Sequence, residues 1–336
     1  MPKLLLSRLR GLSRWCAGLY AWLLLSVLVP QSLAQLERLP PPIDAEEPTL
    51  WGTEKLAWSN GGYTGNAKVP PPSEQIEEFP MTVDVWRWQA LPQGLIYRSY
   101  LAGTKEPRLA SVWNQDKRIG NMWDLTLGGR VGLLRYGTSD PLFPKGWQLD
   151  MEGASILRLN LDHNRDLDAA DFRAGFPLTF SFSRWEHKFA FYHMSSHVGD
   201  EYLVRHPSFQ RINYSRDVLV YGTAFRPNPN WRIYGEVGWA TYFDGGSLPW
   251  ETQFGIEYSP MVPTNLRPRP FLATNCALRQ DRNWSGNLVV QTGIQWCGFA
   301  GQRFRFGFEY YNGLSRQFEF FQQFEQQIGL GFWYDF

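Results

Sequence analysis

The chain has 336 residues, with 33 Lys and Arg against 32 Asp and Glu, and aromatic residues make up 16% of it. This near-neutral charge excludes the strongly basic proteins that bind nucleic acid. So many aromatic side chains are unusual in an aqueous globule. They are typical of a membrane β-barrel, which has aromatic girdles at both interfaces and alternates a polar interior with an apolar exterior.

The first 34 residues have the order of a secretory signal peptide. A segment with four basic and no acidic residues, 3–14, precedes an apolar run over 15–29, and small residues indicate cleavage after Ala34. A retained membrane helix would need about 20 apolar residues. A lipoprotein would need a small residue before its cysteine, whereas Cys16 follows Trp15. We therefore expect export, with 29 Lys and Arg against 32 Asp and Glu in the mature chain.

Residues 35–91 differ from the rest of the chain. Runs of three prolines at 40–42 and 70–72 enclose a stretch rich in Gly, Asn and Glu. Polyproline is extended and cannot donate to a sheet. We interpret 35–91 as an irregular periplasmic arm or linker, and 92–336 as a separate domain.

From Leu95 onward the chain divides into alternating runs near the 10 residues that a tilted membrane strand requires. Clusters of Pro, Gly, Asn and Asp separate the runs. They cover residues 95–101, 121–134, 145–158, 168–182, 186–197, 211–225, 230–243, 249–259, 269–280, 285–298, 302–313 and 325–336. The even count of about 12 predicts an all-β fold, a transmembrane antiparallel up-and-down β-barrel.

The last predicted strand gives the location. Ile328, Leu330, Phe332, Tyr334 and Phe336 recur at every second position and therefore share one face. An apolar strand that ends in an aromatic residue resembles the assembly signal of bacterial outer-membrane barrels. That resemblance implies recognition by the barrel assembly machinery and insertion among outer-membrane lipids.

Orientation follows if Phe336 is periplasmic. The long segments 160–167, 198–212 and 314–323 then lie outside, and short turns lie inside, as such barrels arrange them. A soluble β-sandwich alternates in the same way, but the signal peptide and the terminal Phe336 favour the membrane barrel.

The span from about Leu95 to Phe336 also resembles a bacterial outer-membrane family of unknown function. The segments that carry this resemblance are Gly94–Gly103 and Glu325–Gly329. It implies a barrel and leaves the activity open.

The predicted strand 186–197 contains the candidate chemistry. Phe189, Phe191, His193 and Ser195 share one parity, so a lipid-facing Phe pair implies a lipid-facing His and Ser. Polar groups on such a surface are costly without partners and are functional candidates. His193 could act as general base for Ser195, which would attack an ester carbonyl.

A third residue must orient the imidazole, and Asn213 at the start of the next predicted strand could do so. The three residues resemble the His-x-Ser motif and following Asn of outer-membrane phospholipase A. The resemblance implies His193 as base, Ser195 as nucleophile, Asn213 as orienting residue and the backbone N–H of Ser196 as an oxyanion donor. It also implies calcium and a homodimer.

The sequence departs from that pattern in two places. Ser196 stands where the family usually has Asn, and the gap from Ser195 to Asn213 is longer than in the family. Lipid A deacylases have a similar His-x-Ser with an acidic third member, so Asp200 or Glu201 could replace Asn213. A His-x-Ser also occurs by chance, in which case the chain is a structural barrel or a narrow pore.

Alternating oxygen ligands in one predicted outer loop suit Ca²⁺. They are Asp162, Asn164, Asp166 and Asp168. An EF-hand would need Gly at its sixth position and Glu at its twelfth, which this loop lacks. The alternative is a solvated loop with Asx turns. Cys276 and Cys297 lie on consecutive predicted strands, but the turn between them does not place them opposite each other.

Overall fold

The computed structural model describes residues 85–336. The predicted signal peptide and all but the last residues of the predicted arm lie outside this range. No helix within residues 85–336 is long and apolar enough to cross a membrane.

Thirteen strands make up most of the described chain. They are β1 (Arg87–Ala90), β2 (Leu109–Asp116), β3 (Gly120–Gly137), β4 (Gly146–Asn160), β5 (Asp166–Phe182), β6 (Trp185–Val198), β7 (Ser215–Asn228), β8 (Trp231–Asp244), β9 (Trp250–Tyr258), β10 (Arg269–Arg279), β11 (Ser285–Cys297), β12 (Arg303–Leu314) and β13 (Phe324–Asp335). The short helices are α2 (Asp200–Arg205), η1 (Leu161–His163), η2 (Gln280–Arg282) and η3 (Phe318–Phe320).

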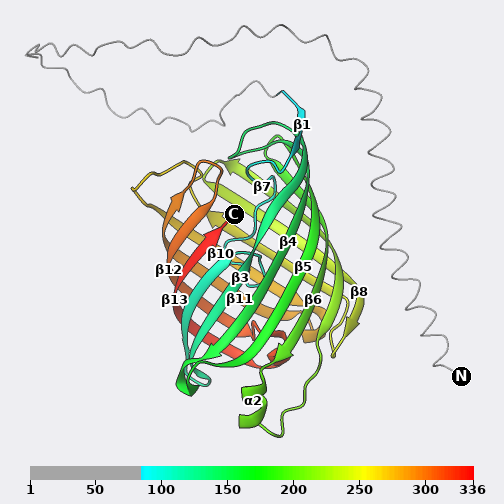
Figure 1. Cartoon of the computed structure of the whole chain (residues 1–336), viewed down its shortest axis with the longest axis vertical. Coiled ribbons are helices and arrows are strands. Elements are labelled where there is room, and N and C mark those ends of the chain that lie inside the picture. The colour runs from blue at the N-terminus through cyan, green and yellow to red at the C-terminus, as the bar shows by residue number, and fades with distance from the viewer. Residues whose placement is uncertain (1–84) are drawn as a thin grey trace, which may run out of the picture. The chain divides into compact units, whose positions relative to one another are not determined.

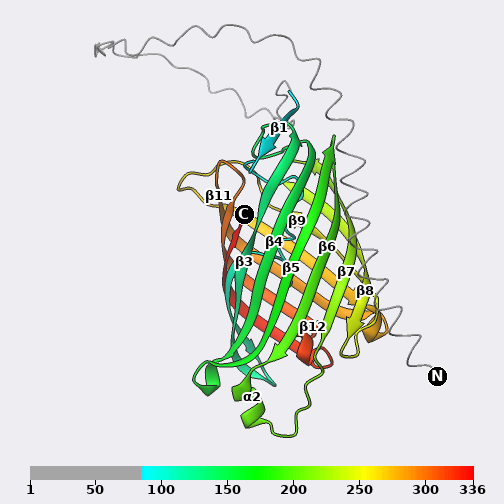
Figure 2. The same cartoon turned by 45° about the vertical axis from the view of Figure 1, so that its right-hand side comes forward.

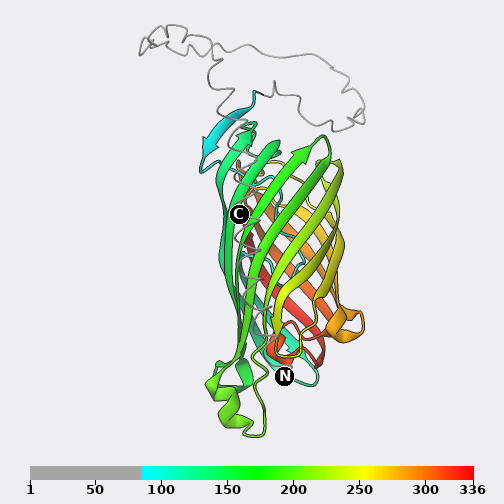
Figure 3. The same ribbon diagram turned by 90° about the vertical axis from the view of Figure 1, so that its right-hand side faces the viewer.

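Strands β2 to β13 form a closed antiparallel barrel. Each pairs with its neighbour in the sequence, and β13 pairs with β2 to close the ring. Figures 1, 2 and 3 show the tilted strands from three sides, with α2 at one end and the label of the C-terminus nearer the other. Twelve strands were expected, and eleven of the expected runs coincide with a strand.

The period of two separates an apolar exterior from a polar interior. On β12, Phe304 and Phe308 are exposed on the outer face, whereas Arg303 and Arg305 point inward and are buried. The terminal strand β13 follows the same rule, with Ile328 exposed. The shared exterior face predicted for the terminal strand is therefore confirmed.

The strand predicted at residues 95–101 is wrong, because this segment lies inside the barrel. The twelfth barrel strand is instead β2. Strand β1 pairs antiparallel with the end of β3, and β2 pairs antiparallel with its first half. Both therefore lie along the same side of β3. Residues 91–108 interrupt this line and fill the lumen; we call them the plug segment.

Backbone geometry turns the chain inward at the start of the plug segment. Leu91 has a φ of 49° and Gly94 a φ of 75°, both outside the extended region that a strand requires. A Cβ on Gly94 would lie 2.1 Å from the carbonyl oxygen of Pro141. Glycine therefore permits a left-handed turn and close contact with the β3–β4 loop.

Arginine side chains hold the plug segment by its backbone carbonyls. Arg135 donates to Gly94 O (2.8 Å), Arg130 to Tyr97 O (2.8 Å) and Arg305 to Leu101 O (3.1 Å). An irregular backbone cannot satisfy its own carbonyls, and a buried carbonyl without a donor is costly. The guanidinium groups of the wall supply those donors, and Tyr97 and Leu101 are fully buried.

Ion pairs fill the rest of the lumen. Arg158 bridges Asp124 (2.9 Å) and Glu325 (2.6 Å), and comparable pairs link other strands of the barrel. Further pairs are Arg130–Asp150, Arg173–Glu152, Lys188–Glu236, Arg216–Glu251, Arg232–Glu257, Arg305–Asp335 and Arg316–Glu309. Charges removed from bulk water need such partners. The interior is thus a packed polar core.

The two ends of the barrel differ as expected only in part. The end with α2 carries the long β6–β7 loop over residues 199–214, and we call it the loop end. The opposite end, with Phe336, has the tight β7–β8 turn. The connections at 183–184 and 298–302 are also short, whereas those at 138–145 and 259–268 are longer, so the expectation of short turns at this end holds for three of the five connections.

Candidate functional site

His193 and Ser195 lie on the exterior face of β6 near the loop end. The burial along β6 alternates, with Tyr192, Met194 and Ser196 buried inside and the residues between them outside. The His193 side chain is 48% exposed. The exterior position expected for both residues is therefore confirmed.

The imidazole of His193 has a carboxylate partner on the next strand. His193 pairs directly with Asp217 of β7, and Nδ1 lies 2.7 Å from Asp217 Oδ1. Since a carboxylate accepts, Nδ1 carries the proton and Nε2 retains its lone pair in the neutral ring. This is the tautomer that a general base for a serine hydroxyl requires.

Ser195 lies two residues beyond His193 on β6, toward the loop end. It faces Phe172 of β5 on one side and Ser215 of β7 on the other. Residues two apart on a strand share a face, so Ser195 is the hydroxyl neighbour of His193 on its own strand. In the described part of the chain, no hydrogen bond joins Ser195 Oγ to His193.

Asn213 precedes β7 in a left-handed turn, with a φ of 51°, and is exposed. Within residues 85–336 it makes no hydrogen bond to His193. The cross-strand position opposite His193 belongs to Asp217, which sequence reasoning missed. Only the register of β6 and β7 identifies Asp217, and the long loop between them leaves that register unspecified.

Ser196 points the other way, into the lumen. Its backbone N–H donates to Tyr214 O (2.9 Å), and its Oγ donates to Asp171 of β5. The N–H expected to hold an oxyanion is thus already engaged between the two strands.

The acidic alternatives belong to the first turn of α2. Asp200 pairs with Arg211 at 3.0 Å, and both Asp200 and Glu201 are exposed. Among the described contacts, neither carboxylate reaches His193.

The predicted calcium ligands are engaged with the protein itself. Asp162 accepts from the Asn121 backbone N–H (2.8 Å) and side chain (2.9 Å), and the Asn121 N–H lowers the pKa of this carboxyl. Arg205 pairs with both Asp166 and Asp168. Asn164 is the left-handed C-cap of η1. No group of three His, Cys, Asp or Glu side chains suited to a metal occurs within residues 85–336.

Cys276 and Cys297 are free thiols, with Cys297 buried. Cys276 pairs with Leu288 across β10 and β11, and Cys297 pairs with Arg303. The register therefore does not place these two residues opposite each other, as expected from the turn between their strands.

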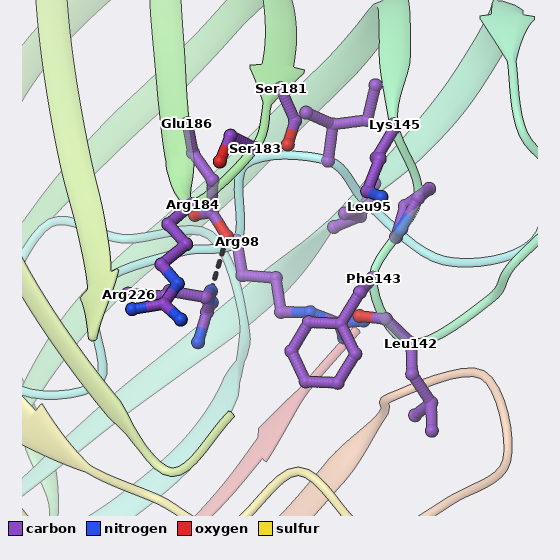
Figure 4. Close-up of a pocket in the computed structure, with 12 residues that line it drawn as sticks. Leu95, Arg98, Leu142, Phe143, Lys145, Ser181, Ser183, Arg184, Glu186 and Arg226 are labelled. Carbon is purple, nitrogen blue, oxygen red and sulfur yellow. Dashed lines mark hydrogen bonds and ion pairs between the residues drawn. The ribbon is translucent and has the colours of Figure 1, made fainter. Parts of the chain in front are cut away.

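Two of the small cavities in the described part of the barrel are lined by neither His193 nor Ser195. One of about 20 Å³ lies where the plug segment meets the β3–β4 loop, and Figure 4 shows Leu95, Arg98 and Phe143 around it, with Glu186 paired to Arg226. The other, of about 70 Å³, lies nearer the loop end beside Lys105. The candidate site is therefore an open patch on the barrel wall.

The sequence profile of a protein family of unknown function, DUF1207, matches residues 66–336. The chain belongs to this family. No curated protein matches the sequence significantly.

Among solved structures, the chain is similar to outer membrane phospholipase A from Escherichia coli. The identity is 11%, the TM-score 0.45, and the match covers 68% of this chain and 93% of that one. For the Salmonella typhi outer membrane phospholipase dimer with bound calcium, the identity is 12% and the TM-score 0.46, and the match covers 68% of this chain and 91% of that one. For a Rhodopseudomonas blastica porin mutant, the identity is 8% and the TM-score 0.27, and the match covers 68% of this chain and 99% of that one. TM-scores below 0.5 do not establish a common fold with these proteins. The outer-membrane-type barrel follows instead from the strand pairing of this chain.

Proposed function

We propose that this protein is an outer-membrane barrel that hydrolyses an acyl ester of a lipid in the surrounding leaflet. Ser195 is the nucleophile, His193 the general base and Asp217 the residue that orients the imidazole. The single observation that carries the proposal is the 2.7 Å contact between His193 Nδ1 and Asp217 Oδ1, on the same exterior patch as Ser195.

The chemistry follows from the roles of these side chains. Asp217 holds the Nδ1 proton, so Nε2 of His193 takes the proton of Ser195 as Oγ attacks the ester carbonyl. His193 then returns this proton to the departing alcohol, and water releases the fatty acid from Ser195 by the reverse route. The imidazolium that forms in between is stabilised by the carboxylate of Asp217.

The surroundings of the patch suit an acyl chain. Phe172 and Phe176 on β5 and Leu219 on β7 are exposed on the exterior face beside it. A lipid that diffuses in the membrane can reach such a wall without entering the lumen. The alternative of a pore is disfavoured because the buried plug segment and the lumenal ion pairs occupy the interior of the barrel.

Fatty acid release from phospholipid in mixed micelles tests the proposal, with the purified, refolded barrel and Ca²⁺ or a chelator present. We expect Ser195→Ala and His193→Gln to abolish release and Asp217→Asn to lower kcat by about 10⁴-fold, as in serine hydrolases. The assay compares Ca²⁺ with a chelator because only the resemblance to the phospholipase implies that calcium is required. A homodimer rests on the same resemblance.

Two variants serve as controls. Ser215→Ala removes the hydroxyl directly across from Ser195 and should leave release unchanged. Asn213→Ala separates the two orienting candidates: a loss larger than that of Asp217→Asn assigns the role to Asn213. Equal background release from the wild type and Ser195→Ala would overturn the hydrolase.

A further inference from the structure

A buried polar cluster lies in the lumen directly behind the candidate site. Asp171 of β5 pairs with Ser196 of β6, the residue after the proposed nucleophile. Asp171 is fully buried and Ser196 is 1% exposed. Because neighbouring strand residues point to opposite faces, a contact at Ser196 acts on the same backbone that carries Ser195.

Asp171 receives donors from three separate segments. Ser196 Oγ and Lys105 Nζ of the plug segment both donate to it, and the backbone N–H of Phe318 in η3 donates at 3.2 Å. The ammonium group is the only full positive charge among these donors. Without it, a buried carboxylate would be left with neutral donors alone, which is costly.

Contacts beyond Asp171 extend the cluster to the loop before β7. Ser196 Oγ accepts from the Glu319 N–H (3.0 Å), and Glu319 Oε2 accepts from the Ile212 N–H (3.1 Å). The Ser196 N–H donates to Tyr214 O (2.9 Å). The cluster therefore fixes the loop ends of β6 and β7, the two strands that carry Ser195 and Asp217.

We propose that Lys105 is a positioning residue for the exterior site. The plug segment places the Lys105 ammonium group in the lumen, where it compensates the buried carboxylate of Asp171 and keeps it bound to Ser196. This contact keeps the loop ends of β6 and β7 in the register that places Ser195 beside His193. The plug segment thereby supports a site on the opposite face of the barrel wall. This inference rests on the proposed function for its catalytic consequence, but the structural coupling can be measured without any activity.

Hydrogen exchange on the refolded barrel tests the coupling. The reporter is the peptide that contains the Ser196 amide, whose hydrogen bond to Tyr214 O closes the end of the β6–β7 ladder. Lys105→Met should raise exchange there about tenfold or more, since breaking one partner of a buried pair favours local opening. Lys105→Arg keeps the charge and should restore most of the protection.

Lys188→Met is the matched control. Lys188 is also a buried lysine of the lumen, paired with Glu236 at 2.5 Å and in contact with the plug segment, but it lies seven residues before Ser195 on the same strand. Seven strand residues span roughly 23 Å. This variant should leave exchange at Ser196 within about twofold of the wild type, because its local opening is remote. Equal exchange in the two Met variants would overturn the positioning role.

Kinetics on the same variants give the catalytic readout. Lys105→Met should lower kcat about tenfold or more and leave KM nearly unchanged, since the geometry of the reacting groups changes while the apolar lipid contacts stay. Faster exchange with unchanged kcat would overturn the link to catalysis. If the wild type releases no fatty acid while exchange rises only in Lys105→Met, the proposed hydrolase fails and the coupling stands.

Discussion

Tyr100→Phe removes a single oxygen atom from the centre of the plug segment. The Tyr100 hydroxyl donates to Glu236 Oε2 (2.8 Å) and lies 2.6 Å from the hydroxyl of Tyr97. The side chain is fully buried, and its ring stacks on Tyr234 with centroids 3.9 Å apart. Phenylalanine keeps the ring and its stacking, so the substitution isolates the hydrogen bonds of the hydroxyl.

The structure sets the size of the effect. A hydrogen bond to a charged group contributes about 1.5–3 kcal/mol. Glu236 keeps Lys188 and Gln253 as partners, so no unpaired charge adds to the loss. We expect the free energy of unfolding to fall by about 2 kcal/mol, which is about a 30-fold change in the unfolding equilibrium constant.

Urea unfolding of the barrel in lipid vesicles measures this difference. Tyr258→Phe is the control, because Tyr258 lies on the exterior face of β9, and no hydrogen bond of its hydroxyl occurs among the described contacts. Its substitution should change stability by less than about 0.5 kcal/mol. Equal effects of the two substitutions would refute the placement of Tyr100 against Glu236 in the lumen.

Three other predictions concern ion conductance through the lumen, the contact between Gly129 and Phe336, and the carboxyl group of Asp162 at the loop end. The refolded barrel should show no ion conductance in planar bilayers, since the plug segment fills it; steady open channels would contradict this. Gly129→Leu should destabilise the barrel by about 1–3 kcal/mol in urea unfolding, because a Cβ there would lie 2.8 Å from the Phe336 ring; an unchanged midpoint would argue against that contact. The lowered pKa of Asp162 means that its bond to the Asn121 N–H should survive as pH falls to the ordinary carboxyl value of 3.8 and be lost below it. Exchange of the Asn121 amide against pH measures this, and loss already near pH 5 would contradict it.

Most of the barrel could be predicted because alternation is a local signal. A strand between lipid and a polar lumen must repeat every two residues, as β12 and β13 do. β2 was missed because its eight residues carry a weak pattern in which Ser111 and Gln115 share the exterior face with Leu109 and Trp113. The sequence instead predicts a strand at residues 95–101, since their aromatic and aliphatic content also suits a strand.

The plug segment could not be predicted from its own residues. Its place in the lumen depends on arginines that come from distant strands, such as Arg130 and Arg305, and donate to its carbonyls. The same is true of the site. His193 and Ser195 are close in sequence and share a parity, whereas Asp217 meets His193 only once closure of the barrel sets the register of β7 against β6.

The filled lumen also bears on where this protein can act. A barrel with an ion-paired interior has its end faces and its outer wall left for binding or chemistry. Among the contacts of a carboxylate with a basic side chain in residues 85–336, His193–Asp217 is the one formed between exterior positions of two strands. An apolar wall gains nothing from a carboxylate and an imidazole, because partly desolvated polar groups cost free energy even when paired. Their place beside Ser195 is therefore what supports the proposed hydrolysis at the wall.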